Sequence, residues 1–233
     1  MIPLRDDVPS RTFPLVNYGL IAINALFFLA ELGMGANLER FFYKAAVIPA
    51  LYLGEDGRFT PGDIFASSFD ADLGSRVLLA MFLHGGWAHF LGNMLYLWIF
   101  GDNVEDRFGH VPYLIFYLLC GLAATFAQLV FSMDSNIPNL GASGAIAGVL
   151  GAYIMLFPGK QIRVLLGNRV GSVSALIVIG LWIILQLFSG VASITTATAD
   201  TGGVAFMAHI GGFVAGLLLT FLFRGNTARQ LTR

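Results

Sequence analysis

Long apolar segments recur along this chain of 233 residues, and they constrain its fold more than any other feature. Because a membrane-spanning helix needs about 20 apolar residues, these segments predict an all-α, polytopic membrane protein. Charged residues make up only 12% of the sequence, about half the share that a soluble domain carries, which excludes a soluble enzyme. The six expected helices cover residues 15–31, 87–106, 112–131, 143–157, 172–191 and 204–223.

The connecting segments indicate a single domain, residues 1–233, with both termini in the cytosol. If the N-terminus is placed in the cytosol, most Lys and Arg residues fall in cytosolic segments. The short outer loops 132–142 and 192–203 then carry none. The long first loop, residues 32–76, holds aromatic residues and scattered charges, and we expect it to lie partly on the membrane surface. The formal net charge of −1 leaves no basic face, so nucleic-acid binding is not expected.

The fourth segment is too short to cross a bilayer in the ordinary way. Residues 143–157 reach about 22 Å as a helix, whereas the hydrocarbon core is about 30 Å thick. Pro158 and the basic loop after it fix the cytosolic end, so the helix must begin roughly 8 Å below the outer surface. Loop 132–142 must then dip into the membrane, which is tolerated only beside protein or a water-filled cavity. Ser143 stands at the top of this sunken helix.

Polar residues from three helices are expected near the depth of Ser143, and polar residues inside a membrane indicate function. His209 is placed about 8 Å into the sixth helix. His89 and Asn93 are four residues apart and share one face of the second helix. A serine, a histidine and hydrogen-bond donors suit acyl transfer, because the histidine can take the hydroxyl proton and the donors can stabilise an oxyanion. Since no carboxylate lies at this depth, the residues predict a Ser143–His209 dyad.

Glycines on two helices explain how these groups come close. The fourth segment reads SGAIAGVLG and the sixth reads AHIGGFVAG, and both carry the small-xxx-small spacing that lets helix backbones approach. Gly141, beside the serine, leaves room for a substrate strand. His84 lies just outside the second helix, and its role stays open between structural hydrogen bonding and support of the site. Gln128 and Gln186 are interpreted as hydrogen-bonding residues between helices.

Three motifs make the chain resemble the rhomboid intramembrane serine proteases. HGGWAHFLGNM, residues 84–94, is similar to the H-x-x-x-N pattern on the second helix of that family. GASGAIAG, residues 141–148, resembles its G-x-S-G nucleophile motif, and AHIGGFVAG, residues 208–216, resembles its A-H-x-x-G-x-x-x-G. The order of the motifs also agrees, and the resemblance covers essentially the whole chain.

The resemblance implies a six-transmembrane-helix bundle of rhomboid type in which Ser143 is the nucleophile and His209 the base. It implies that His89 and Asn93 help to form the oxyanion hole, and we assign Gly141 to the same oxyanion or substrate-binding site. Members cleave transmembrane protein substrates in the lipid bilayer near its outer face, and they need no metal or cofactor. The basic six-helix form favours a multi-pass protein of a bacterial inner (cell) membrane.

Two positions depart from the family's pattern. Some members carry a Tyr four residues after the serine, stacked under the catalytic histidine, whereas this chain has Ala147, so another group must orient His209. Many members carry a Trp-Arg pair in the first loop, where this chain offers Glu39–Arg40 beside Phe41–Phe42. Neither departure removes a group assigned to catalysis.

Two other functions are alternatives to a protease. A catalytically dead rhomboid-like protein would bind membrane clients, but such proteins lose the serine or histidine that this chain keeps. A small transporter with a sunken helix as its anion site would be expected to show repeat symmetry or several broken helices. The sequence does not indicate the oligomeric state, the natural substrate or the element that admits it.

Overall fold

The computed structural model describes residues 1–53, 71–196 and 205–224, and it places helices in all six predicted segments. Three of these helices, α1, α7 and α10, are long and apolar enough to cross a membrane, and α8 and the described part of α9 are shorter apolar helices. The fold is therefore that of an integral membrane protein. The helices of the six segments are α1 (Leu15–Leu32), α5 (Trp87–Tyr96) continued by α6 (Asp102–Phe108), α7 (His110–Phe131), α8 (Ser143–Leu156), α9 (Ala175–Thr196) and α10 (Phe206–Phe223).

A small sheet corrects the all-α prediction. The strands β1 (Ile2–Asp6), β2 (Gln161–Leu166) and β3 (Arg169–Ser174) pair antiparallel in the order β1-β2-β3. The fifth helix therefore begins at residue 175 rather than at 172. Gly167, with a φ of +62°, sits in the two-residue turn between β2 and β3, a conformation that glycine adopts without strain.

The predicted long first loop, residues 32–76, contains helices. It contains the amphipathic helix α2 (Leu38–Ala45), and a further helix, α4 (Ala71–Ala80), precedes α5. One 3₁₀ turn precedes α2 and another, Pro49–Tyr52, follows it. The remainder of the predicted loop, residues 54–70, lies outside the described residues.

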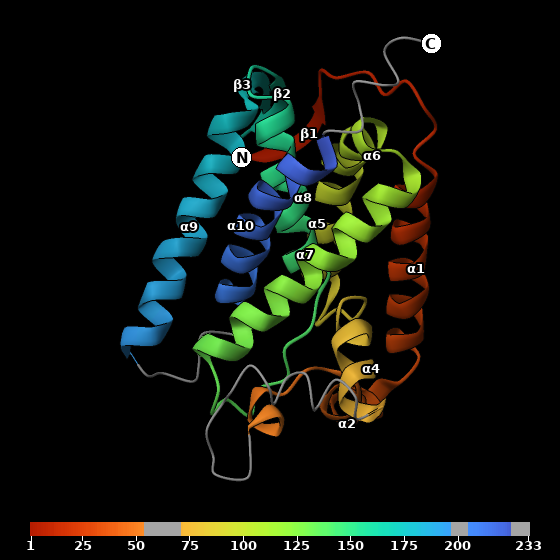
Figure 1. Cartoon of the computed structure of the whole chain (residues 1–233), viewed down its shortest axis with the longest axis vertical. Helices are drawn as coiled ribbons and strands as arrows, with labels where there is room; N and C mark the ends of the chain where they lie inside the picture. Colours follow the sequence, from red (N-terminus) through yellow and green to blue (C-terminus); the bar gives the residue numbers. More distant parts are fainter. Residues whose placement is uncertain (54–70, 197–204, 225–233) are drawn as a thin grey trace.

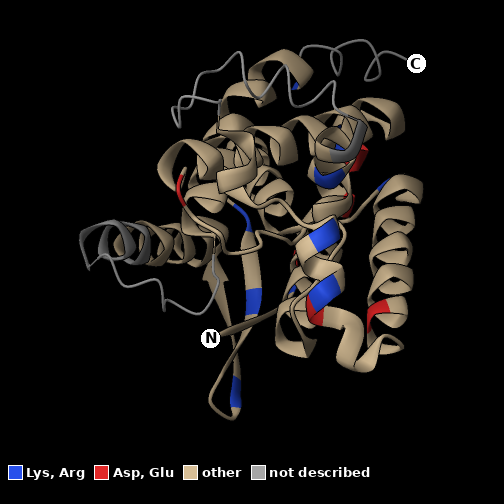
Figure 2. Cartoon of the chain, turned by 90° about the horizontal axis from the view of Figure 1, so that it is seen from below, with Lys and Arg blue, Asp and Glu red and all other residues tan. Residues whose placement is uncertain are grey.

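The short helix α8 forms the centre of the bundle. It packs against α10, α7, α5 and α9, and its residues 144–153 are all buried. In Figure 1, α9 and α1 lie on opposite sides of this centre, the sheet lies at one end, and α2 and α4 lie at the other. Figure 2 shows that Lys, Arg, Asp and Glu are sparse and absent from most of the helical surface. The apolar outer face of the helices suits contact with lipid.

Glu105 of α6 fixes the start of α1, whose preceding residue supplies no side-chain cap. Its carboxylate accepts the backbone N–H groups of Val16 and Asn17 at 2.9 and 2.7 Å, which satisfies two donors left free at the helix terminus. The Asn17 amide in turn donates to the carbonyl of Leu97, 3.0 Å away, in the π-helical turn Leu97–Gly101 that joins α5 to α6. The π-helical turn between α5 and α6 is thus tied to α1 by hydrogen bonds.

Candidate active site

The nucleophile and base predicted from the sequence lie in contact. Ser143 is the first residue of α8, His209 is in the first turn of α10, and the Ser143 Oγ is 2.7 Å from the His209 Nε2. The His209 side chain is buried, and Ser143 is partly exposed. The distance is that of a hydrogen bond between a hydroxyl and a neutral imidazole, the arrangement that activates a serine.

Glycines bring α8 and α10 into backbone contact. A Cβ added at Gly212 would overlap the carbonyl oxygen of Gly144, and one added at Gly216 would overlap the carbonyl oxygen of Gly148. A Cβ at Gly151 would lie 2.6 Å from another backbone carbonyl oxygen, that of residue 213. The two helices can approach this closely only because these positions lack side chains.

The segment before Ser143 is held by residues of the first loop and of α4. Val47 and Asn139 exchange two backbone hydrogen bonds, with N···O distances of 3.1 and 2.7 Å. The backbone N–H of Gly141 donates to the carbonyl of Ala80 at 2.7 Å, and Ala142 is completely buried. These three bonds pair part of the irregular backbone inside the protein, as is needed for irregular backbone at membrane depth.

Asn93 and His89 line a cavity of about 580 Å³ together with Ser143 and His209. Asn93 is 7% exposed, and its Nδ2 donor has no hydrogen-bond partner among the described residues. An unpaired buried donor costs free energy unless an acceptor arrives, so this amide is available to a bound oxygen. Among the described residues, no carboxylate or Lys or Arg side chain lines the cavity.

Gly141 allows the His89 ring to reach the serine. Its φ of +132° disfavours any other residue, and an added Cβ would lie 2.7 Å from the His89 Nε2. The backbone N–H of Gly85 points to the His89 Nδ1 at 3.4 Å. Because Nδ1 then acts as the acceptor, Nε2 is the nitrogen that carries the proton, and it faces the space beside Ser143.

His84 supports His89 through its backbone and its ring. Its N–H donates to the buried carboxylate of Glu31, at 3.1 and 3.3 Å from the two oxygens. Its ring meets that of His89 edge to face, with centroids 5.2 Å apart. The backbone bond to Glu31 fixes the loop from which the Gly85 N–H reaches His89, whereas the two ring nitrogens of His84 have no hydrogen-bond partner among the described residues.

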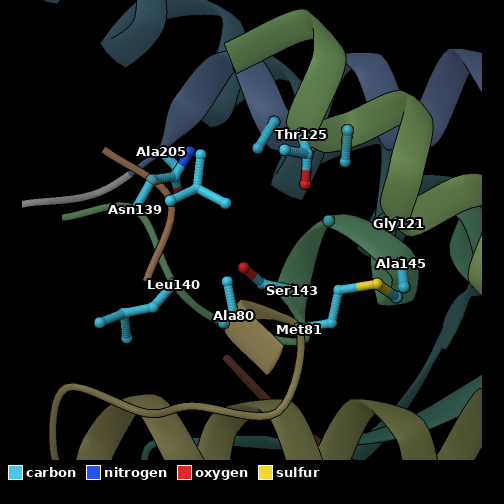
Figure 3. A pocket seen from close by; sticks show the side chains of 14 residues that line it. Ala80, Met81, Gly121, Thr125, Asn139, Leu140, Ser143, Ala145 and Ala205 are labelled. Carbon is cyan, nitrogen blue, oxygen red and sulfur yellow. The ribbon is translucent and has the colours of Figure 1, made fainter. Parts of the chain in front are cut away.

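A second, small cavity of about 20 Å³ adjoins the other side of Ser143. Figure 3 shows the Ser143 hydroxyl directed into it, with Thr125 and Met81 at its edge. Its walls are mostly small residues, among them Gly121, Gly144 and several alanines. This volume holds about one water molecule or a methyl-sized group.

Two residues of α9 complete the surroundings of His209, and neither was predicted from the sequence to lie in the site. The Gln186 Oε1 lies 2.7 Å from the His209 Nδ1. The Trp182 ring packs on the imidazole with centroids 5.5 Å apart and an interplanar angle of 43°. Ala147, where some members of the resembled family carry a Tyr, is completely buried in α8.

The sequence held one signal for the role of Gln186. It is a polar residue in an apolar helix, four positions after Trp182 and hence on the same helix face.

Comparison with known proteins fixes the family. The model of the rhomboid domain family matches residues 73–226, more than half of the chain. The chain belongs to the rhomboid family. The matched range contains every residue assigned to the site, from His84 to His209.

Several curated proteins are similar to this rhomboid chain. RHOMBOID-like protein 4 of Arabidopsis thaliana is 36% identical over 152 residues, which cover 65% of this chain and 34% of that protein. Rhomboid protease GluP of Bacillus subtilis is 32% identical over 206 residues, which cover 87% of this chain and 34% of that protein. Rhomboid-like protein 11, chloroplastic, of Arabidopsis thaliana is 24% identical over 205 residues, covering 85% of this chain and 65% of that protein. The chain thus spans about a third of the length of the first two relatives.

Proposed function

We propose that this protein is an intramembrane serine endopeptidase that hydrolyses peptide bonds in or near transmembrane segments of other membrane proteins. One observation carries the proposal: the Ser143 Oγ lies 2.7 Å from the His209 Nε2 at the edge of a cavity of about 580 Å³. The likeness to a relative named rhomboid protease GluP supports it. The chemistry uses side chains and backbone groups alone, without a metal or cofactor.

In the first half of the reaction, His209 takes the Ser143 hydroxyl proton on Nε2 while Oγ attacks the substrate carbonyl carbon. The carbonyl oxygen becomes an oxyanion, which accepts hydrogen bonds from the Asn93 amide, the His89 Nε2–H and the backbone N–H of Ser143. The start of α8 adds the positive end of a helix dipole at the same place. These donors act most strongly where charge develops in the transition state.

In the second half, the tetrahedral intermediate collapses and the carbon–nitrogen bond breaks. His209 gives its proton to the leaving amine, and the acyl group remains as an ester on Ser143. A water molecule that loses a proton to His209 attacks the ester and forms a second oxyanion at the same donors. Collapse of this intermediate returns the proton to Oγ and releases the carboxylic acid product.

We place the site in the outer half of a six-span membrane domain, residues 1–233, with both termini in the cytosol. The absence of Lys and Arg from loops 132–142 and 192–203 supports this orientation. The relatives come from a bacterium and from a plant, and one of the plant proteins is named as chloroplastic. The bacterial cell membrane therefore remains a proposal, supported by the six-helix form alone.

A serine-reactive probe tests the proposal directly. We expect an activity probe of the fluorophosphonate class to label the full-length protein in liposomes at Ser143, as mapped by mass spectrometry. A client-binding protein without activity or a transporter would not react covalently at this serine. Absence of both labelling and reporter cleavage in folded protein would reject the protease.

The Asn93 amide is expected to serve turnover more than binding. Asn93→Ala should lower kcat by about 10²-fold, the usual effect of losing one oxyanion donor, and by less where the other donors compensate. The KM for a transmembrane reporter should stay close to the wild-type value, because the donor acts mainly on the transition state. Weaker substrate binding with kcat unchanged would contradict this role.

The substrate must present an unwound stretch to the site. A peptide bond inside a helix is shielded by the backbone hydrogen bonds of that helix. Unwinding the helix in lipid leaves backbone N–H and C=O groups unpaired, at a cost of several kcal/mol for each group. Weak helix formers in the outer part of the span lower this barrier. The cavity of about 20 Å³ beside Ser143 favours a small residue before the cut.

Two matched reporters test this substrate class. We expect a span with Gly-Ala-Ser-Gly in its outer third to be cut there, and the same span with Leu in those positions to be cut at least about ten times more slowly. Mass spectrometry of the products locates the cut. Equal cleavage of both reporters, or a cut in the cytosolic half, would contradict the proposed mechanism.

A further inference from the structure

His209 has a second polar partner, on a helix that carries none of the predicted catalytic residues. For Nε2 to accept the Ser143 hydroxyl proton, the neutral imidazole must carry its own proton on Nδ1. A proton at that position needs an acceptor. The Gln186 Oε1 of α9 lies 2.7 Å from Nδ1, at the distance of such a hydrogen bond.

We propose that Gln186 is a positioning residue for the Ser143–His209 pair. Its side-chain oxygen accepts the Nδ1 proton of His209, which fixes the tautomer and the ring orientation and keeps Nε2 free to take the serine proton. The inference rests on the proposed protease function and deepens it. It also supplies the group that must orient His209 where Ala147 offers no aromatic ring.

Trp182 acts with Gln186 on the same face of α9. It lies one turn before the glutamine, and its ring packs on the imidazole at a centroid distance of 5.5 Å. The indole limits tilting of the imidazole out of its own plane. The hydrogen bond to the Gln186 amide oxygen fixes the rotation of the imidazole within that plane. Helix α9 therefore contacts the Nδ1 side and one face of the His209 ring, while Ser143 of α8 contacts Nε2.

The surroundings of His209 leave the glutamine as its specific acceptor on Nδ1. The titratable side chains that face the cavity from α5 are His89 and Tyr96. Helix α8 contributes the hydroxyl of Ser143. From α7, the Gln128 Oε1 accepts the backbone N–H of Ala208, and the Gln128 Nε2 donates to the Ser132 Oγ. None of these residues is a carboxylate that could replace the amide oxygen.

Two substitutions of Gln186 separate a positioning role from a structural one. Gln186→Leu keeps the size of the side chain and removes the acceptor, and we expect kcat to fall about 10²-fold with KM nearly unchanged. Gln186→Glu restores an acceptor, and we expect it to recover most of kcat. Because its carboxylate also stabilises the imidazolium, it should move the acidic limb of the pH–rate profile about one pH unit higher.

The assay uses the full chain in liposomes, with kcat and KM measured on a transmembrane reporter across the pH range and Tm measured for each variant. Gln128→Leu is the matched control, because it removes a glutamine that supports the start of α10 without touching the His209 ring. We expect it to lower Tm while the acidic limb stays in place. If Gln186 only packs, Gln186→Glu should likewise lower Tm while the acidic limb of its pH–rate profile stays in place.

The outcomes are distinguishable from failure of the protease itself. Wild-type kcat in folded Gln186→Leu, or an unmoved acidic limb in Gln186→Glu, overturns the positioning role while Ser143→Ala stays inactive. If Gln186→Leu does not fold, the position of the acidic limb in the pH–rate profile of Gln186→Glu tests the positioning role by itself. Cleavage by Ser143→Ala at the wild-type rate would instead remove the function on which this inference rests.

Discussion

Ser143→Ala is expected to abolish cleavage of a transmembrane reporter while the protein stays folded. The hydroxyl is the proposed nucleophile, and its loss removes one hydrogen bond to His209 without leaving a cavity larger than one oxygen atom. His209→Ala should lose as much activity, because a nucleophile and its base act as a unit. We expect each variant to fall by at least about 10⁴-fold, and the double variant to fall no further.

Gel analysis of reporter cleavage in liposomes measures this loss, and thermal unfolding in detergent checks the fold. Ser172→Ala is the matched control, because Ser172 is an exposed residue of β3 at the opposite end of the bundle. It should cleave and bind the serine probe like the wild type. Wild-type turnover by well-folded Ser143→Ala would rule out the proposed nucleophile.

The meeting of Ser143 and His209 was predictable because it depends on helix positions that the sequence encodes locally. Pro158 limits one end of the fourth segment and the irregular residues before Ser143 limit the other, so the serine falls at the start of a short helix. The glycines at 144 and 212 then mark the faces that touch. Residue spacing and depth were sufficient for this part of the site.

The contact of Gln186 with His209 was not predictable in the same way. It depends on the rotation of α9 about its axis and on its height relative to α10. Residues 197–204 between the two helices lie outside the described residues, and most of the residues near Gln186 in its helix are apolar. A hydrophobic pattern therefore gives no direction for this side chain, and only the three-dimensional arrangement shows its partner.

The sheet escaped prediction for a different reason. The pairing of β1 with β2 joins Ile2 to Leu165, a separation along the chain that no local pattern reports. The hairpin itself carried a signal, since Gly167 stands in a two-residue turn between runs that include buried Ile162 and Val164. Apolar residues that continue into the fifth helix obscured the boundary, so the helix was predicted to begin at residue 172.

Gly212→Ala is expected to inactivate the protein through the backbone contact between α8 and α10. The added Cβ overlaps the carbonyl oxygen of Gly144, and this atom cannot move aside as the end of a flexible side chain would. Helix α10 must shift away from α8 and carry His209 with it. The Ser143 Oγ and the His209 Nε2, now 2.7 Å apart, then separate beyond hydrogen-bonding distance, and a misplacement of about 1 Å can cost about 10²-fold in rate.

We expect Gly212→Ala to lower kcat by about 10²-fold or more and to destabilise the fold by about 1–3 kcal/mol, the usual cost of overpacking. Gly19→Ala in α1 is the matched control, because it adds the same methyl group to a membrane-spanning helix, where no atom of the described residues lies within 4 Å of the new Cβ. It should keep wild-type activity and gain stability by up to about 1 kcal/mol from the better helix former. If Gly212→Ala cleaves the reporter as fast as Gly19→Ala, close packing of the two helices is not what holds the serine and histidine together.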